Sequence, residues 1–289
     1  MRIWITGASG RLGRQLLSQV PMGVKIFSPS RVQVDMHNIN AAMPLIKQFA
    51  PTHIINTAAC NDVDKTELEP HEAWSLNHVA VGHLANIAKQ LGARLVHIST
   101  DFVFDGTASQ PYLPTSATNP ISEYGKSKEA GEQVALARCS NCIVIRTASL
   151  YSINGLNFIN TILKRLAYQD LIEVVSDQTT SPTYAASLAR CVWQFIPRSE
   201  TGLWHFTDAG YVSKLDFAQA IVQDAFALGL LAGDKQVVGM HSRGSTAIAR
   251  RPSFSVLNKD ATWSITGKPP EWRQQLRFYL QLLVTQRNA

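Results

Sequence analysis

The sequence predicts an α/β fold built on a doubly wound parallel sheet, and three observations carry this prediction. Short apolar runs alternate with longer segments of helical period over residues 1–150. A glycine-rich turn directly follows the first of these runs. The composition, 45% hydrophobic and 17% charged residues, is that of a globular protein rather than a disordered one. Strands that alternate with helices pair in parallel through right-handed crossovers, which places helices on both faces of the sheet.

The first half of the chain supplies five strands and four helices. The strands are short apolar runs, at residues 3–5, 24–27, 53–56, 94–98 and 142–146. The helices follow a period of 3.6 residues, at residues 11–20, 40–49, 72–91 and 124–137. In the first helix Leu12, Leu16 and Leu17 share one face, and Gly92 takes the C-cap position of the third.

The alternation becomes less regular after about Leu150. Ser213 and Asp216 have the spacing of a capping box, which predicts the start of a helix that runs towards Leu228. Residues 272–285 have the pattern of a last amphipathic helix. No internal repeat or flexible linker separates this half from the first, so we expect it to pack against the sheet.

Composition and charge exclude several classes of protein. The net charge of +6 is spread over the chain, and no run of five basic residues occurs, so we expect no nucleic acid partner. No apolar run approaches the ~18 residues that cross a bilayer, so we expect no membrane partner. The charge instead suits an enzyme with a polyanionic ligand, for which a nucleotide would suffice.

Cysteine and histidine usage indicates a cytoplasmic protein without a metal site. The four cysteines form no disulfide framework, and a reducing compartment is the default for such a chain. The pair Cys139 and Cys142 has the spacing of half a zinc site but lacks a second half, so we interpret it as structural. The eight histidines are dispersed, and we expect no metal.

The glycine-rich turn predicts a dinucleotide site. It reads G-x-x-G-x-x-G between the first strand and the first helix. Gly7 permits the tight turn, Gly10 lets the backbone approach a pyrophosphate, and Gly13 lets helix and strand pack closely. The free N–H groups of the helix N-terminus favour phosphate groups. The residues expected to hold the cofactor here are Gly7, Ser9, Gly10, Arg11, Leu12 and Gly13.

The end of the second strand indicates which dinucleotide binds. NAD sites usually carry an acidic residue there, which holds the ribose 2′-hydroxyl. This chain has Ser30 and Arg31 instead, and a hydroxyl and a guanidinium suit a 2′-phosphate. We therefore expect NADPH to be preferred, with NADH possible. Asp35 and Met36 follow closely and are assigned to the adenine end of the cofactor.

A threonine, a tyrosine and a lysine form the candidate catalytic group. Thr100 follows the strand that ends at Ile98, and Tyr124 and Lys128 stand four residues apart on one face of a helix. An ammonium group near a phenol favours the phenolate, so we expect Lys128 to lower the pKa of Tyr124 from ~10. Tyr124 would then give a proton to a developing alkoxide, Thr100 would donate a hydrogen bond to the same oxygen, and Lys128 would hold the nicotinamide ribose.

These motifs, in this order, resemble the extended short-chain dehydrogenase/reductases. The sequence carries T-G-x-x-G-x-x-G from Thr6, S-T-D-F-V-F-D-G from Ser99 and Y-G-K-S-K from Tyr124. Within that superfamily it is most similar to the dTDP-4-dehydrorhamnose reductase family. Segments at 58–65, 177–183 and 249–252 support this resemblance, the last two most specifically.

The resemblance implies NADPH-dependent reduction of the 4-keto group of a nucleotide-activated 6-deoxy-hexulose. For the family this is dTDP-4-dehydro-L-rhamnose, and the product is dTDP-L-rhamnose. It also assigns residues by their place in the family motifs. Ala58 and Ala59 would contact the cofactor together with Tyr124 and Lys128. The substrate would be contacted by Val63, Thr100, Asp101, Phe102 and Ser149, and its diphosphate by Arg250 and Arg251.

Two departures from the family pattern affect these expectations. Family members often have a tryptophan beside the sugar where this chain has Ser149, so the sugar is held differently or is a different one. Some members dimerise through a magnesium ion bound by glutamates, one of them on the first helix. The first helix here, beginning Arg11-Leu12-Gly13-Arg14, has no acid, so we expect a monomer or a weak homodimer.

Two alternatives remain beside the reductase. A sugar-nucleotide epimerase or dehydratase of the same fold needs an additional base near Thr100, and the loop at 101–105 offers none that is evident. A non-catalytic NADP-binding regulatory subunit would not need Thr100, Tyr124 and Lys128 to be intact. Under the leading interpretation residues 1–150 form an NADP-binding Rossmann domain, residues 151–200 add a strand and helices to it, and residues 201–289 form mainly a smaller substrate-binding domain.

Overall fold

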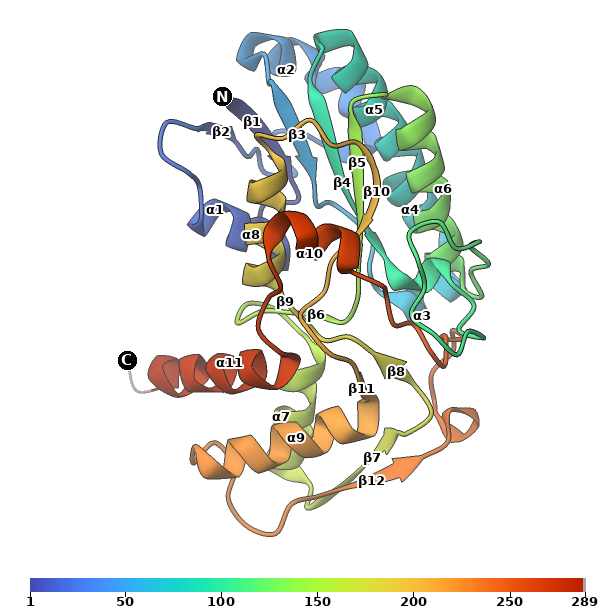
Figure 1. The fold of residues 1–289 in the computed structure, drawn as a ribbon, viewed down its shortest axis with the longest axis vertical. Coiled ribbons are helices and arrows are strands. Elements are labelled where there is room, and N and C mark those ends of the chain that lie inside the picture. Colours follow the sequence, from blue (N-terminus) through green and yellow to red (C-terminus); the bar gives the residue numbers. More distant parts are fainter. Residues whose placement is uncertain (288–289) are drawn as a thin grey trace.

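A six-stranded parallel sheet forms the upper half of the molecule in the computed structural model, which describes residues 1–287 (Figure 1). The strands occur in the order β10-β5-β4-β3-β1-β2, and every neighbouring pair is parallel. Their bounds are β1 Arg2–Thr6, β2 Lys25–Phe27, β3 His53–Asn56, β4 Arg94–Thr100, β5 Cys142–Thr147 and β10 Gly202–His205. The apolar runs bury both faces, as β5 does along its whole length between β10 and β4.

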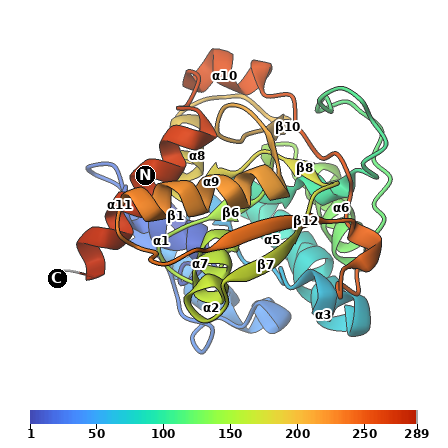
Figure 2. The same cartoon turned by 90° about the horizontal axis from the view of Figure 1, so that it is seen from below.

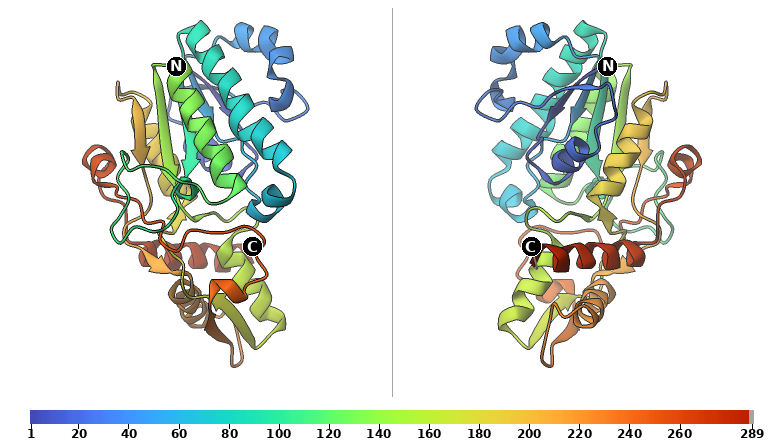
Figure 3. Two further views of the ribbon diagram at one scale, coloured as in Figure 1. Left: turned by 90° about the vertical axis from the view of Figure 1, so that its right-hand side faces the viewer. Right: turned by 90° about the vertical axis from the view of Figure 1, so that its left-hand side faces the viewer.

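Helices cover both faces of the sheet, which confirms the doubly wound parallel arrangement (Figure 3). The helices α1 (Arg11–Ser18) and α8 (Ala185–Phe195) pack on one face through a shared apolar core. The opposite face carries α2 (Met43–Phe49), α5 (Ala80–Leu91) and α6 (Glu123–Arg138), which share a second core with the sheet. The predicted strands and helices of the first half are therefore present, with the differences described next.

Two of the predicted helices differ in detail. A 3-10 helix at Met36–Ala42 precedes α2, which begins at Met43 because Pro44 occupies its first turn, where proline is tolerated. The segment predicted as one helix over 72–91 consists of α4 (Pro70–Trp74), a π-helical stretch at Ser75–Val79 and α5. A short helix that the pattern did not indicate, α3 (Val63–Leu68), precedes them.

The strand order places a switch point between β1 and β3. From β1 the chain moves outward to β2, then crosses back to form β3 on the other side of β1. The connections after β1 and β3 therefore diverge and leave a crevice at the carboxyl ends of these two strands, where open α/β sheets bind ligands. Gly7 and Ala58 lie at this point. Gly7 directly follows β1, and Ala58 is the second residue after β3.

The lower part of the molecule has its own apolar core. The helices α7 (Phe158–Tyr168), α9 (Lys214–Ala227) and α11 (Trp272–Arg287) surround it, together with the parallel pair β7 (Leu171–Val175) and β12 (Gln236–Met240) (Figure 2). Two short pairs connect this part to the sheet region. They are β6 (Leu150–Tyr151) with β9 (Thr183–Tyr184), and β8 (Thr179–Thr180) with β11 (Val212–Ser213).

The chain passes between the two parts several times. It enters the lower part at β6, returns with α8 and β10 to complete the sheet, and leaves again with β11 and α9. The helix α10 (Asp260–Thr266) packs beside β10 before α11 closes the lower core. The sequence predicted that residues 151–200 extend the sheet domain and that residues 201–289 form mainly the smaller domain. In the structure residues 151–175 contribute to the lower core, whereas residues 202–205 belong to the sheet. No helix within residues 1–287 combines the length and apolar character of a membrane span.

Candidate active site

Two adjoining cavities open at the carboxyl ends of the strands. Each has a volume of about 550 Å³, and they share four wall residues, Gly7, Ser9, Ala58 and Leu76. The first cavity lies between the sheet and the lower part of the molecule. The second lies over the ends of β1 and β2. Together they form an elongated site that crosses the switch point.

The glycine turn is shaped for close approach between backbone segments. A Cβ atom on Gly7, whose φ is +65°, would lie 2.6 Å from the Ala58 nitrogen. A Cβ atom on Gly13 would lie 2.5 Å from both the Cα atom of Ala8 and the carbonyl oxygen of Gly7. Gly13 is buried and outside both cavities, so its part in the site is the close packing of helix and turn. Gly10 differs, because a Cβ atom on this residue would meet only the Gly7 oxygen, at 3.1 Å. Gly10 also lines the first cavity.

The N-terminus of α1 is available to an anion. Gly10 is its N-cap residue, no side chain caps it, and its first turn contains no acid. Unsatisfied N–H groups and the positive end of the helix dipole favour a phosphate at this position. Arg11 and Leu12 line the first cavity with Gly7, Ser9 and Gly10. The Arg11 guanidinium donates to the Leu156 oxygen at 2.8 Å, which connects the turn to the lower part.

The second cavity contains the residues predicted to select the cofactor. Ser30, Arg31, Asp35 and Met36 all line it. The Arg31 side chain is exposed there, and Arg14 from α1 lines the same cavity, although the sequence did not indicate this second arginine. The Asp35 carboxylate accepts from the His37 N–H at 3.0 Å, so one oxygen is engaged within its own turn.

The three candidate catalytic residues come together in the first cavity. Thr100 ends β4, and Tyr124 and Lys128 lie in the first turns of α6, which Ser122 caps by accepting from the Gly125 N–H. The Tyr124 hydroxyl donates to Asn61 at 3.4 Å. The Lys128 ammonium donates to the Ile98 oxygen at 2.7 Å, a bond that fixes it beside the end of β4.

The expectation that Lys128 lowers the pKa of Tyr124 is wrong for the protein alone. Burial raises the pKa of Tyr124 to about 12, while hydrogen bonding with Thr100 and the charge of Arg11 oppose this shift. Burial lowers the pKa of Lys128 to about 8, and Glu132 opposes that shift. Desolvation dominates both pKa shifts because both side chains are almost fully enclosed, at 8% and 2% exposure. Tyr124 is therefore a neutral phenol near pH 7, the form that a proton donor needs.

Asp101 is buried beside Thr100, and each of its carboxylate oxygens accepts a hydrogen bond. Ser255 donates to one carboxylate oxygen at 2.5 Å, and the Thr100 hydroxyl donates to the other at 3.1 Å. Burial raises the pKa of Asp101 to about 6, against the effect of these hydrogen bonds. Ser255 lies in the segment after Arg251, so Asp101 connects that segment to the candidate catalytic threonine.

The remaining residues of the predicted substrate wall also line the first cavity. Val63 and Phe102 stand on the sheet side, with the Phe102 ring 5.8 Å from the Tyr124 ring in an edge-on arrangement. Ser149 has a φ of +43°, which is uncommon for a residue other than glycine, and its hydroxyl lies 3.0 Å from that of Thr180. Such strained positions cluster at functional sites. Ala58 and Ala59 complete the wall beyond β3.

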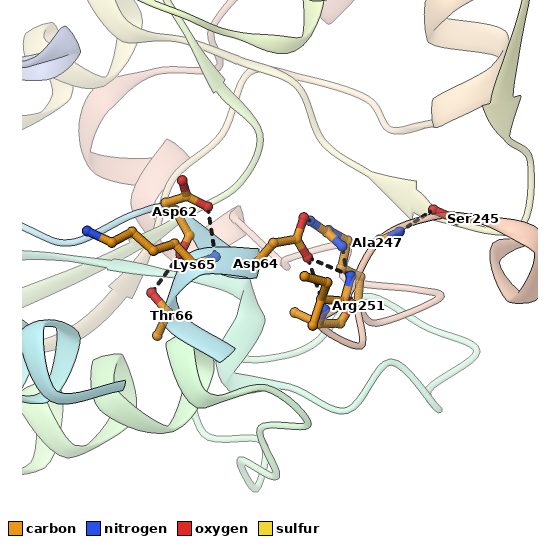
Figure 4. A network of polar contacts seen from close by, with 9 residues as sticks. Asp62, Asp64, Lys65, Thr66, Ser245, Ala247 and Arg251 are labelled. Atoms are coloured by element: carbon orange, nitrogen blue, oxygen red, sulfur yellow. Dashed lines mark hydrogen bonds and ion pairs between the residues drawn. The ribbon is translucent and has the colours of Figure 1, made fainter. Parts of the chain in front are cut away.

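The structure separates the two adjacent arginines. Arg251 lines the first cavity, whereas Arg250 is exposed and outside both cavities. Asp64 from α3 accepts from Arg251 at 2.8 Å and also from the backbone N–H groups of Ile248 and Ala249 (Figure 4). This carboxylate thereby ties the segment at 247–251 to the sheet side of the cavity.

Sequence reasoning missed several residues of the first cavity. Most come from the lower part or from the segment that returns to the sheet: Asn61, Tyr151, Phe158, Gln178, Thr180, Lys214, Phe217 and Ser255. Gln178 and Thr180 lie in the segment 177–183 that carried the family resemblance, so a signal for them was present. Lys214 follows the N-cap serine of the predicted helix and has no motif of its own.

Comparisons with known proteins agree with this geometry. The family model described as the RmlD substrate binding domain matches residues 1–285. A dTDP-4-dehydrorhamnose reductase from Aggregatibacter actinomycetemcomitans is 34% identical, with 96% of this chain and 97% of that protein covered.

Solved structures are similar over almost the whole chain. A dTDP-4-dehydrorhamnose reductase from Clostridium acetobutylicum has a TM-score of 0.91 at 34% identity, with 98% of this chain and 99% of that chain covered. One from Bacillus anthracis, solved in complex with NADP, has a TM-score of 0.91 at 31% identity, with 97% and 99% covered. These matches agree with the family that the motifs indicated. The chain therefore belongs to the RmlD substrate binding domain family, to which it is matched along nearly all of its length.

Proposed function

We propose that this chain catalyses the NADPH-dependent reduction of the 4-keto group of dTDP-4-dehydro-L-rhamnose to give dTDP-L-rhamnose. The observation that carries the proposal is the placement of Thr100, Tyr124 and Lys128 in one cavity with the glycine turn of β1. This cavity joins a proton donor to a site shaped for a dinucleotide. The names of the relatives supply the substrate, since curated relatives with 34% identity are dTDP-4-dehydrorhamnose reductases.

The residues present fit NADPH. The pyrophosphate would lie at Gly10 and the N-terminus of α1, which no side chain caps. The 2′-phosphate would lie in the second cavity against Ser30, Arg31 and Arg14. When bound, NADPH supplies the hydride that reduces the ketone carbon. Lys128 would hold the nicotinamide ribose from its position at the end of β4.

Tyr124 donates the proton in this proposal. Its raised pKa, about 12, keeps the phenol protonated at neutral pH, so the proton is available to the developing alkoxide. Thr100 stabilises the same oxygen with a hydrogen bond once its hydroxyl turns from Asp101 to the substrate. Asp101 retains the hydrogen bond from Ser255 during this change.

The two alternatives are less well supported. An epimerase or dehydratase would need a further base beside Thr100, but Phe102 faces the cavity there and Asp101 is engaged by two hydroxyl groups. A regulatory subunit that binds NADP without turnover would not require the Tyr124 phenol beside the dinucleotide site. We further propose, from the sequence, that the protein is cytoplasmic and that it is a monomer or a weak homodimer. Light scattering of the purified protein would test the oligomeric state.

Absorbance of the reduced coenzyme tests the proposed reaction. We expect dTDP-4-dehydrorhamnose to oxidise one NADPH per sugar, and other nucleotide-linked 4-keto sugars in a small panel to react more slowly. A UDP-linked substrate that reacts faster would correct the nucleotide, and a different preferred sugar would correct the assignment at Ser149. The absence of oxidation with every member of the panel, in a protein that binds NADPH, would favour the regulatory alternative.

A further inference from the structure

The ammonium group of Lys214, in the first cavity, has no hydrogen-bond or ion-pair partner among the residues that the structure describes. Lys214 is the first residue of α9, where its backbone N–H donates to the Gln178 oxygen at 2.9 Å. Its half-buried side chain lines the same cavity as the candidate catalytic group. Within residues 1–287, no hydrogen bond or ion pair is made by its Nζ atom. A charge that is partly withdrawn from water and has no partner is unfavourable, which indicates that a ligand supplies the missing anion.

Three carboxylates affect the pKa of Lys214, and each of them accepts hydrogen bonds from other groups. Asp64 accepts from Arg251 and two backbone N–H groups. Asp101 accepts from Ser255 and Thr100. The third, Asp177, accepts from the hydroxyl and N–H of Ser242 and lies 3.2 Å from His241. Each carboxylate therefore raises the pKa of Lys214 from a distance, and none of them forms an ion pair with it.

A second cation lies near Lys214 in the same wall. Arg251 lines the same cavity as Lys214, and its charge adds to the effect of burial in lowering the pKa of Lys214. Asp64 orients the Arg251 guanidinium from the side of α3, as Figure 4 shows, while another of its nitrogens donates to the Ala249 oxygen. Lys214 and Arg251 thus contribute two positive charges to the cavity wall, and only that of Arg251 is paired with a carboxylate within the described residues.

The cavity that contains these two cations also contains the candidate catalytic group. Lys214 and Arg251 line it together with Thr100 and Tyr124. A nucleotide sugar whose ketone lies at Thr100 and Tyr124 therefore brings its diphosphate into the same cavity, and the diphosphate supplies the anion that Lys214 lacks.

We propose that Lys214, together with Arg251 held by Asp64, binds the diphosphate of the nucleotide sugar, and that Arg250 has no part in it. This inference rests on the proposed function and deepens it. Lys214 acts on substrate affinity and not on the proton transfer at Tyr124. It also makes the affinity depend on pH, since burial and Arg251 lower the pKa of Lys214 to about 8, and only the ammonium form attracts the diphosphate.

Calorimetric titration with dTDP tests the proposal without turnover. We expect Lys214→Met to weaken dTDP binding about 10- to 100-fold, the loss of a charge-assisted contact, and Lys214→Arg to restore most of it. NADPH binding should be unchanged in both variants, which shows that they are folded. The matched control is Lys164→Met, because Lys164 is exposed on α7 and outside the cavity. Arg251→Ala should weaken dTDP binding, and Arg250→Ala should not.

The pH dependence supplies a second, independent arm. Above pH about 8 the affinity of the unaltered protein for dTDP should fall by up to about tenfold per pH unit, because binding then requires a proton. Lys214→Arg should bind dTDP with no such fall, since a guanidinium stays charged. Equal dTDP affinity in Lys214→Met and the unaltered protein, or the same pH dependence in Lys214→Arg, would overturn the proposal while reductase activity stands. A protein that neither binds dTDP nor reduces the sugar would overturn the proposed function as well.

Discussion

Replacing Gly10 with alanine tests whether this glycine is needed for folding stability or for binding the cofactor. In the protein alone, the added Cβ atom meets only the Gly7 oxygen, at 3.1 Å. The φ of Gly10 is −73°, which alanine adopts without strain. The cost to stability is therefore small, ~1 kcal/mol, most of it from an alanine in place of glycine at the helix N-cap.

The same methyl group occupies the space into which the pyrophosphate must come. If the phosphate loses one or two charge-assisted hydrogen bonds at ~1.5–3 kcal/mol each, NADPH affinity falls at least about tenfold. Gly7→Ala should instead cost ~2–5 kcal/mol of stability, the sum of ~1–2 kcal/mol for a left-handed backbone and ~1–3 kcal/mol for overpacking against Ala58.

Two measurements on each variant distinguish these effects. NADPH binding is followed by fluorescence titration, and stability by urea denaturation. The control is Gly23→Ala, because Gly23 also has a positive φ but has no neighbouring atom within 4 Å of a Cβ position. It should lose ~1 kcal/mol of stability and bind NADPH normally. A Gly10→Ala protein that is stable and binds NADPH as tightly as the unaltered protein would refute this account of the turn.

Three further predictions concern other parts of the molecule. Arg31→Ala should reduce the preference for NADPH over NADH about 10- to 100-fold by removing a contact to the 2′-phosphate, measured as the ratio of kcat/KM for the two coenzymes; an unchanged ratio would exclude Arg31 from the site. Glu132→Gln should cost ~3–5 kcal/mol in urea denaturation, because it leaves Arg146 charged at 3% exposure without the carboxylate that now lies 2.6 Å away; a smaller loss would mean that the contacts of the guanidinium with the Pro114 oxygen and the Phe104 ring are sufficient for it. Thr100→Val should lower kcat by about 10²–10³-fold with little effect on NADPH affinity, and a normal kcat in stopped-flow measurements would remove Thr100 from the reaction.

The parts of the site that could be predicted from sequence are those with short, fixed spacing. The turn from Gly7 to Gly13 and the pair Tyr124 and Lys128 are each positioned by a single helix start, so local geometry determines how their residues lie. Thr100 could be added because it ends a strand, and parallel strands bring their carboxyl ends to one edge.

The other residues of the site are brought together by long-range packing, which no local sequence pattern indicates. Lys214 and Ser255 reach the cavity from the lower part, more than 85 residues from Lys128, so no local pattern relates them to it. The direction of the pKa shift of Tyr124 was predicted wrongly because the spacing of the pair indicates proximity, whereas the result is determined by burial. Likewise the adjacent Arg250 and Arg251 looked equivalent, but Asp64 holds only one of them at the cavity.

The π-helical stretch shows the same limitation in the fold. A period of 3.6 residues continues through Asn77, so the sequence predicted one regular helix. In the structure the Asn77 side chain binds both the N–H and the oxygen of Cys60, at 2.9 and 3.0 Å, and donates to Ser127. These bonds link the helix to the segment after β3 and to α6, a long-range requirement that a local pattern does not reveal.

The proton-transfer step is tested most directly by comparing Tyr124→Phe with the unaltered protein in two measurements on the same preparation. The substitution removes one oxygen from an enclosed ring and leaves the glycine turn unchanged. With dTDP-4-dehydrorhamnose as substrate, we predict that kcat falls by about 10²–10⁴-fold while the Kd for NADPH stays the same. A variant that binds NADPH normally and reduces the sugar at close to the original rate would contradict the account.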